Sequence, residues 1–461
     1  MDSILNIINS IRDAIWGLPL IFLLVGTGIF VTIRNHLVQI RGFKHSFELI
    51  SGRYDKPHHK GEITHFQALS AALSATIGTG NITGVATAIA VGGPGALFWM
   101  WITAIFGMAV KFTSCTLAVM YRRIDPDGYV RGGPMYFIEL GMSKKFRFLA
   151  YMFAICTAIA SMGTGNMVQA NSVADGIVAL FDKSGTPAGL MMRLGIGLVI
   201  GVLVGLVIIG GIKRIGKVAS RIVPFMVVIY VGSALIVLVF AYRMIIPAFE
   251  IILSHAFTPT SATGGFAGAT IWLTLQQGVR RGVFSNESGL GSAPMAHAAA
   301  KVNEPVREGL VAMIGPFVDT LVICTITGLV IMVSGQWDNG LNGTPLTASA
   351  FEAILPTWGS SMVSLGLVLF AFSTIISWSY YGEKGIEYIF GRKAVLPYKW
   401  IFLIFIPVGA ALRLDIVWGF ADIANGLMAL PNLIALLALS GVVAAACRKY
   451  FHELGQGMHR D

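Results

Sequence analysis

The sequence predicts an all-α protein that crosses a membrane many times. Hydrophobic residues make up 55% of the 461 residues and charged residues only 12%, about half the charged fraction of a soluble protein. The apolar residues fall in many stretches of roughly 17–25 residues, which is the length that spans a hydrocarbon core as a helix. The 54 glycines are dispersed through these stretches, as in helices that pack closely in lipid. This composition excludes a soluble globular domain and a disordered chain.

Eleven membrane-spanning helices are expected. The first follows Asp2, Arg12 and Asp13, which make a poor start for a signal peptide, and no small-residue cleavage site follows it, so we expect it to be retained. Short connections predict a single membrane domain over residues 1–461. The expected helices occupy residues 17–36, 66–91, 96–121, 148–180, 190–211, 221–242, 266–299, 308–334, 359–382, 399–413 and 420–447.

Basic residues predict the orientation. One set of connections and the C-terminus carry 25 Lys and Arg residues, and the opposite set carries five. The richer side is expected in the cytoplasm, which puts the N-terminus outside and the C-terminus inside a plasma or inner membrane. An odd number of helices agrees with this. The net charge of +10 therefore indicates topology, and we expect the lipid bilayer and no nucleic acid as a partner.

Two of the expected helices are interrupted by glycine and polar residues, at 78–81 and at 282–291. Glycine costs about 1 kcal/mol relative to alanine inside a helix, so both helices are expected to break. A break frees backbone N–H and C=O groups, which is tolerated only around a cavity and indicates a transporter site at mid-membrane. Alternatively, the glycines only let helices pack closely. The two breaks are five helices apart, so they would open two five-helix halves, at 66–242 and 266–447, after one extra helix at 17–36.

Three further sets of polar residues lie inside apolar stretches. Asn166 and Gln169 are three residues apart on one helix and need partners there, either a substrate or a neighbouring backbone. Lys111 and Asp319 are either paired internally or face an aqueous pathway. Glu287 could receive an ammonium group, carry a proton, or form an ion pair with one of the nearby arginines 280 and 281; we prefer the ion pair.

Four stretches of the sequence carry a family resemblance. They are GGPGALFWMW at residues 92–101, the preceding IGTGNITGVATAIAVGGPG, GNMVQANSVAD, and GVFSNESGLGSAP. Together they resemble the alanine or glycine:cation symporters, or sodium:alanine symporters, of the amino acid–polyamine–cation superfamily, and the similarity covers essentially the whole chain. The resemblance implies a LeuT-type fold with a five-plus-five inverted repeat, and sodium-driven uptake of alanine or glycine by alternating access. Spacing alone predicts only a secondary transporter with a mid-membrane site.

The resemblance also implies which residues contact the amino acid. The backbone of the first break would hold its carboxylate, while Asn81 would contact substrate or ion, or cap the second half-helix. Phe284 and Trp378 would crowd the substrate side chain and restrict it to glycine or alanine. The expected substrate contacts are Gly78, Thr79, Gly80, Asn81, Asn166, Gln169, Phe284, Asn286 and Trp378.

The resemblance also implies a sodium site, formed by the adjacent hydroxyls of Ser373 and Thr374 together with the backbone carbonyls of Ser74 and Ile77. These groups are all oxygen donors, which a hard cation prefers. Alternatively, the hydroxyls only bond to their own helix.

The alternatives to sodium-coupled uptake are proton coupling, an enzyme and a passive channel. Proton coupling through Glu287 is the runner-up. An enzyme is not expected, because the sequence contains no HExxH, GxSxG or phosphate-loop motif and its four cysteines lack ligand spacing. A passive channel is a third alternative. We expect sodium as the coupling ion, a small amino acid as the partner, and a functional monomer.

Overall fold

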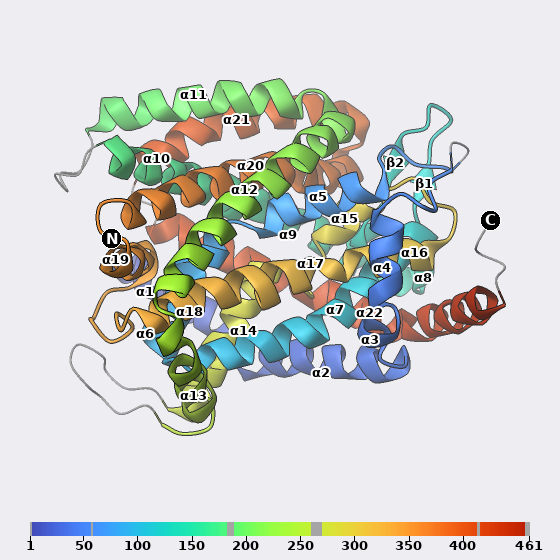
Figure 1. Cartoon of the computed structure of the whole chain (residues 1–461). Helices are drawn as coiled ribbons and strands as arrows, with labels where there is room; N and C mark the ends of the chain where they lie inside the picture. Colours follow the sequence, from blue (N-terminus) through green and yellow to red (C-terminus); the bar gives the residue numbers. More distant parts are fainter. Residues whose placement is uncertain (1, 57–58, 182–188, 260–269, 413–414, 457–461) are drawn as a thin grey trace.

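The computed structural model describes residues 2–56, 59–181, 189–259, 270–412 and 415–456 (Figure 1). Within these residues, nine helices are long and apolar enough to cross a membrane. The remaining two expected spans are the broken helices, each built from shorter pieces. All eleven expected spans therefore have a counterpart, and the prediction of an all-α membrane protein is confirmed.

The spans correspond to the following elements. They are α2 (Leu18–Arg34); α5 (His65–Thr76), η1 (Gly80–Gly84) and α6 (Val85–Gly92); α7 (Ala96–Met120); α9 (Arg147–Met162), η3 (Gly163–Met167) and α10 (Val168–Phe181); α11 (Leu190–Ile208); α12 (Gly211–Phe240); α14 (Ile271–Asn286) and α15 (Ala293–His297); α16 (Pro305–Ala312), α17 (Ile314–Pro316), η5 (Phe317–Cys324) and α18 (Thr325–Val333); α20 (Gly359–Phe390); α21 (Val395–Ala411); and α22 (Asp415–Gly455).

Several connections hold short elements that the sequence pattern did not predict, because each is too short to span a membrane. The helices α13 and α19 lie at one end of the bundle, while α4, α8 and the antiparallel hairpin of β1 and β2 lie at the other (Figure 1). These additional elements are α1 (Asp2–Ile15), α3 (Val38–Arg41), α4 (Phe43–Ile50), β1 (Arg123–Ile124), β2 (Val130–Arg131), α8 (Pro134–Gly141), α13 (Ile245–His255), α19 (Gly343–Ile354) and the short 3₁₀ helices η2 (Lys144–Phe146), η4 (Tyr242–Met244) and η6 (Arg392–Ala394).

The start of α1 and the end of α22 lie at opposite ends of the bundle (Figure 1). The end with the hairpin and the end of α22 also holds the connections at 34–60, 122–147, 213–221, 301–307 and 384–399, which are rich in Lys and Arg. We call it the Lys/Arg-rich end. The exposed sides of α11 and α12 are apolar, with Leu198, Val202, Phe225 and Val228 all more than half exposed, which is typical of a lipid-facing surface.

The first break falls where the glycines predicted it. A capping box of Thr64 and Gln67 begins α5, and the helix ends at Thr76, after which Ile77 is extended (φ −74°, ψ 92°). The chain then enters the π-helix η1, a wide helical form that is often found at functional sites.

The second break is shorter than expected. Residues 282–286 remain helical, and α14 ends only at Asn286, where Glu287 adopts a left-handed conformation (φ 55°). Gly289 (φ 95°) and Gly291 (φ 88°) occupy backbone conformations that favour glycine. Gly282 has another role: a Cβ there would lie 3.3 Å from the Met100 Cα, so the glycine lets α14 pack closely on α7.

Candidate functional site

A small cavity of about 20 Å³ lies where the two broken helices meet α20 and α22. Its walls combine backbone from the first break with polar and aromatic side chains. In volume it accommodates about one water-sized molecule. The residues that line it are Ala75, Thr76, Gly78, Thr79, Gly80, Thr164, Gln169, Phe284, Glu287, Leu290, Thr374, Trp378 and Asn425.

Two glycines of the first break are required by close approach. A Cβ on Gly78 would lie 2.7 Å from the Thr374 hydroxyl oxygen, and a Cβ on Gly80 would lie 3.1 Å from the Ser285 Cα. Any side chain at Gly78 would therefore displace that hydroxyl. The glycines bring the backbone of the first broken helix against both α20 and the second broken helix.

The four residues expected to bind a cation are brought together by α5 and α20. Ser74 donates its hydroxyl to the Ser373 carbonyl at 2.7 Å. The hydroxyl oxygens of Ser373 and Thr374 lie 3.3 and 3.2 Å from the Ser74 carbonyl oxygen, and the Thr374 hydroxyl is also 3.4 Å from the carbonyl oxygen of Ile77. Oxygen atoms from two distant segments therefore converge at the end of α5.

The hydroxyl protons have a second acceptor. Ser373 and Thr374 both lie within hydrogen-bond distance of the Phe370 carbonyl, at 2.9 and 3.0 Å. Each hydroxyl has one proton, and when it is donated to Phe370 the oxygen lone pairs face the carbonyls of α5. Back-bonding within the helix and cation binding are therefore compatible here, and the two interpretations of these hydroxyls do not exclude each other.

Trp378 is held against the second break. Its indole N–H donates to the Glu287 carboxylate at 2.9 Å, and Ser292 donates its hydroxyl to the other carboxylate oxygen. A Cβ on Gly165 would lie 2.3 Å from the Trp378 Cβ, so the tryptophan packs directly on the backbone of η3. The ring that walls the cavity is thus fixed from two sides.

The ion pair expected between Glu287 and a nearby arginine is wrong. Arg280 instead lies 3.0 Å from Asp422 and 3.7 Å from Asp13. Arg280 lies seven positions before Glu287, which corresponds to a rise of about 10 Å along a helix. The helix ends at Asn286, directly before Glu287. Within the described part of the chain, Glu287 makes no ion pair with a basic side chain.

Only one of the two amides in the fourth expected span reaches the cavity. Gln169 lines it and donates to the Thr164 carbonyl at 3.1 Å and to the Thr79 hydroxyl at 3.3 Å. Asn166 points elsewhere and donates to the Phe402 carbonyl of α21 at 2.6 Å. The π-helix η3 at Gly163–Met167 alters the helical phase between them, so the two amides do not share a face.

Asn81 and Asn286 do not line the cavity, but each bonds its own break to η5. The Asn81 carbonyl accepts from the Gly78 backbone N–H at 2.9 Å, and its amide donates to Asp319 at 2.8 Å. In the same way Asn286 accepts from the Ser288 N–H at 2.9 Å and donates to Thr320 at 3.0 Å. Each asparagine therefore connects its break to η5.

Asp319 is paired with other buried side chains, which is one of the two alternatives that the sequence allows. Besides Asn81, its carboxylate accepts from the hydroxyls of Ser285 and Thr320, both at 2.8 Å. The carboxylate thereby connects η1 and α14, the pieces of the two broken helices that lie away from the Lys/Arg-rich end. Lys111 is also buried, and its ammonium group lies beside Gly315.

A second buried carboxylate connects α5 and α15, the pieces of the broken helices at the Lys/Arg-rich end. Glu308 of α16 contacts the imidazole Nδ1 atoms of His65 in α5 and His297 in α15. Arg122 adds four hydrogen bonds, to backbone carbonyls at positions 60, 298, 300 and 302. Among the described residues, no group of three or more His, Cys, Asp or Glu side chains has the arrangement of a metal site.

Two polar residues of the cavity were not expected. Asn425 of α22 donates to the Thr164 hydroxyl at 3.0 Å, and both side chains line the cavity. An asparagine inside a long apolar helix is a signal for a functional site and could have drawn attention to Asn425. Leu290, Ala75 and Thr76 have no such signal in the sequence.

A bundle of membrane-spanning helices with two broken helices around a buried polar cavity is the architecture of a secondary transporter. The chain belongs to the sodium:alanine symporter family, whose model matches residues 1–461. It is 46% identical to a sodium/alanine symporter of Methanococcus maripaludis over 98% of both chains. It is also 38% identical to a probable sodium/glutamine symporter of Bacillus subtilis, over 99% of this chain and 93% of that one.

The fold is that of a LeuT-type transporter. The structure resembles that of MhsT in complex with L-phenylalanine, with a TM-score of 0.59, 14% identity, and coverage of 82% of this chain and 89% of the other. The expected fold class and the expected transport role are therefore confirmed, and the chain is a membrane symporter for an amino acid and not an enzyme.

Proposed function

We propose that this protein couples the entry of a sodium ion to the uptake of alanine, glycine or both. The observation that carries the proposal is the convergence of oxygen atoms from Ser74, Ile77, Ser373 and Thr374 beside the central cavity. Neutral hydroxyl and carbonyl oxygens suit a hard monovalent cation, and none of them needs to lose a proton to bind it.

The cavity supports a small amino acid as the cargo. The backbone of Gly78, Thr79 and Gly80 would receive its carboxylate, because a broken helix presents free N–H groups there. Phe284 and the fixed Trp378 wall the remaining space. The cavity of about 20 Å³ has room for about one water and must widen to admit any amino acid, so the smallest side chains need the least rearrangement. One relative is named as a probable glutamine symporter.

The bias of basic residues supports placing the Lys/Arg-rich end in the cytoplasm. Transport would then proceed by alternating access between the two ends of the bundle. Monomeric function and the five-plus-five repeat boundaries remain predictions from the sequence.

Uptake into proteoliposomes tests the coupling ion. Radiolabelled alanine and glycine should accumulate above their external concentration when an inward sodium gradient is present, and a protonophore should not reduce the accumulation. Equal accumulation with potassium in place of sodium would contradict the proposal. Equilibration without accumulation would instead identify a passive channel.

Proton coupling is the second candidate, and one observation favours it. The Glu287 carboxylate is buried at the cavity, and within the described residues no basic side chain lies within ion-pair distance of it. If a proton is transported, Glu287→Gln should abolish uptake driven by a pH gradient. If sodium is the only coupling ion, wild-type uptake should not respond to a pH gradient imposed at constant sodium.

A further inference from the structure

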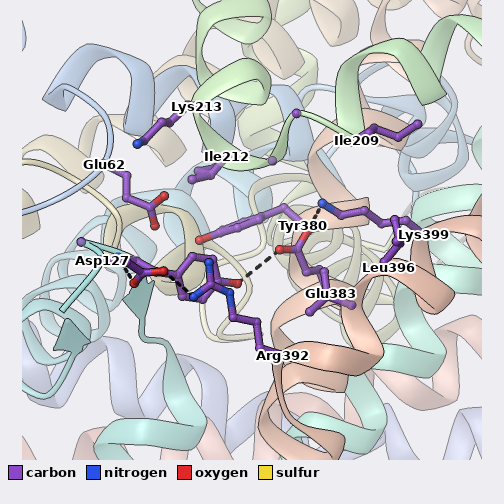
Figure 2. Close-up of a pocket in the computed structure, with 15 residues that line it drawn as sticks. Glu62, Asp127, Ile209, Ile212, Lys213, Tyr380, Glu383, Arg392, Leu396 and Lys399 are labelled. Carbon is purple, nitrogen blue, oxygen red and sulfur yellow. Dashed lines mark hydrogen bonds and ion pairs between the residues drawn. The ribbon is translucent and has the colours of Figure 1, made fainter. Parts of the chain in front are cut away.

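A second, larger pocket of about 370 Å³ opens at the Lys/Arg-rich end (Figure 2). It is lined by Glu62 before α5, the β1–β2 connection, residues 209–213 at the α11–α12 turn, α20, η6 and the start of α21. None of the sequence motifs singled out above lies in this pocket. The pocket is therefore separate from the proposed substrate and sodium sites, with which it shares no lining residue.

The pocket lies directly beyond the central cavity along α20. Trp378 lines the central cavity, and Tyr380 and Glu383 on the same helix line the second pocket. Glu383 lies five positions after Trp378, which corresponds to a rise of about 8 Å along the helix. Between the two spaces, the Tyr381 ring packs on Trp378 with centroids 5.4 Å apart, and Lys384 is almost fully buried. An amino acid that left the central cavity toward this end would meet the second pocket next.

The route between the two spaces is closed by hydrogen bonds to the hairpin. The Lys384 ammonium donates to the Tyr129 hydroxyl at 2.9 Å, the Val130 carbonyl at 2.8 Å and Glu387 at 2.8 Å. Tyr129 in turn donates to Glu387 at 2.9 Å. These contacts hold the β1–β2 connection against the end of α20. The second pocket lies on the side of these contacts that faces away from the central cavity.

The floor of the pocket has buried groups of both charges. Glu383 and Lys399 form an ion pair at 3.0 Å and are 3% and 6% exposed. Tyr380 is 2% exposed, and its hydroxyl has no hydrogen-bond partner in the described structure. Figure 2 shows the Tyr380 hydroxyl pointing into the pocket on the side of Glu62. A buried hydroxyl without a partner is costly, so this site favours a polar ligand.

The rim adds a second pair of opposite charges. Lys213 is exposed and points toward Glu62 across the pocket (Figure 2). One Glu62 oxygen accepts from the Val130 N–H at 2.9 Å. Burial raises the pKa of the Glu62 carboxyl above its usual range. A cationic group beside this carboxyl would favour its charged form and so offset the effect of burial. Arg392 and Asp127 pair with each other at 2.6 Å, as Glu383 and Lys399 do.

We propose that this pocket is a second binding site for the zwitterion of a small amino acid, occupied on the cytoplasmic side of the closed route. Glu62 would receive the α-ammonium group. Lys213 would receive the carboxylate, and Tyr380 would donate its hydroxyl to it. A simple anion or cation would satisfy only half of these groups, whereas an amino acid carries both charges. The proposal rests on the proposed uptake of amino acids and on the proposed orientation.

Such a site would raise the local concentration of amino acid beside the inner opening. It would therefore lower the half-saturating concentration for transport that starts from the cytoplasmic side. The external half-saturating concentration depends on the central cavity, so the pocket should affect it less. This asymmetry distinguishes a binding role from a general loss of folding.

The test compares membrane vesicles of opposite orientation. Uptake of labelled alanine by inside-out vesicles measures the half-saturating concentration at the Lys/Arg-rich end, and right-side-out vesicles measure it at the other end. The variants are Tyr380→Phe, which removes only the unpartnered hydroxyl, and Lys213→Gln, which removes one cation from the rim. Lys217→Gln is the matched control, because Lys217 is exposed on α12 one turn further along and does not line the pocket.

Each pocket variant should raise the half-saturating concentration in inside-out vesicles about three- to tenfold, as expected for one lost hydrogen bond or charge contact, and by more than in right-side-out vesicles. Lys217→Gln should leave both values unchanged. Unchanged values in both pocket variants, or an equal rise in Lys217→Gln, would overturn the second site. Absence of sodium-driven uptake by the wild type in right-side-out vesicles would overturn the proposed function itself.

Discussion

Ile63 and Ala300 pair in a parallel bridge between the segment that leads into α5 and the segment that follows α15. Around it, the Lys301 N–H donates to the Ile63 carbonyl at 2.7 Å, and the Glu62 N–H donates to the Ala299 carbonyl at 2.8 Å. Arg122 and the Glu308–histidine contacts reinforce the same junction. The pieces of the two broken helices at the Lys/Arg-rich end are therefore joined by backbone as well as side-chain bonds.

The junction predicts that α5 and α15 move together during transport. A disulfide between cysteines introduced at Ile63 and Ala300 should leave alanine uptake at more than half of the reduced level. The four native cysteines are buried and should not interfere. Uptake by the double variant, measured before and after oxidation, checks this. Loss of uptake on oxidation, with recovery on reduction, would show that the two pieces must separate.

A second cysteine pair serves as the contrasting control. Glu62 belongs to the joined segment, whereas Val130 belongs to the hairpin that closes the route beside α20. A disulfide between cysteines at these two positions should block transport, because it ties the moving segment to the hairpin. Reduction should restore uptake.

Thr374→Ala should weaken sodium activation. The substitution removes the hydroxyl oxygen that lies 3.2 Å from the Ser74 carbonyl and 3.4 Å from the Ile77 carbonyl. Loss of one oxygen ligand should raise the half-saturating sodium concentration about tenfold, which corresponds to about 1.4 kcal/mol. Ser379→Ala is the control, because Ser379 is equally buried on α20 but only donates to the Ile376 carbonyl. Equal sodium dependence in both variants would contradict the site.

Gly78→Ala should disturb the same site through its backbone partner. The added Cβ would lie 2.7 Å from the Thr374 hydroxyl oxygen, a distance at which one of the two groups must shift. Sodium-dependent uptake should fall at least tenfold. Gly84→Ala, also in the first broken helix, has no atom within 4 Å of its added Cβ and should retain wild-type uptake. Similar activities of the two variants would show that the contact is unimportant.

Trp378→Ala should admit larger amino acids. The indole ring walls the cavity and is held by Glu287 and by the backbone at Gly165, so its removal enlarges the space that the substrate side chain enters. Competition of labelled alanine uptake by valine and glutamine measures the effect, and both should compete at least tenfold more strongly than with the wild type. Unchanged selectivity would mean that Trp378 does not limit substrate size. Trp378→Phe separates the loss of volume from the loss of the indole N–H.

Most of the fold was accessible from local sequence signals. Apolar length located the spans, and glycine with polar residues located both breaks, because a helix interior tolerates neither without cost. The second break was placed too early because Gly282 lies inside α14 and serves packing against α7. A glycine that permits close approach and one that ends a helix look alike in a sequence.

The site was accessible only in part. Adjacent hydroxyls and a glycine-rich break are local patterns, and the structure brings Ser373, Thr374, Ser74 and Gly78 together. Asn166 was grouped with Gln169 on the assumption of regular helix, and η3 separates them. Asn425 comes from a helix some 260 residues from Thr164, and no pattern within either segment specifies that contact.

Local properties of the chain are enough to predict a bundle of membrane-spanning helices with two breaks and, through the motifs, the transporter family. These properties depend on the apolar length of each segment and on backbone preference, which neighbouring residues set. Packing in three dimensions is needed to bring Glu287 to Trp378 and not to an arginine, to bond Asn81 and Asn286 to η5, and to join α5 and α15. Each buried polar group must find a partner, and because that partner comes from a segment distant in the chain, no local pattern specifies it.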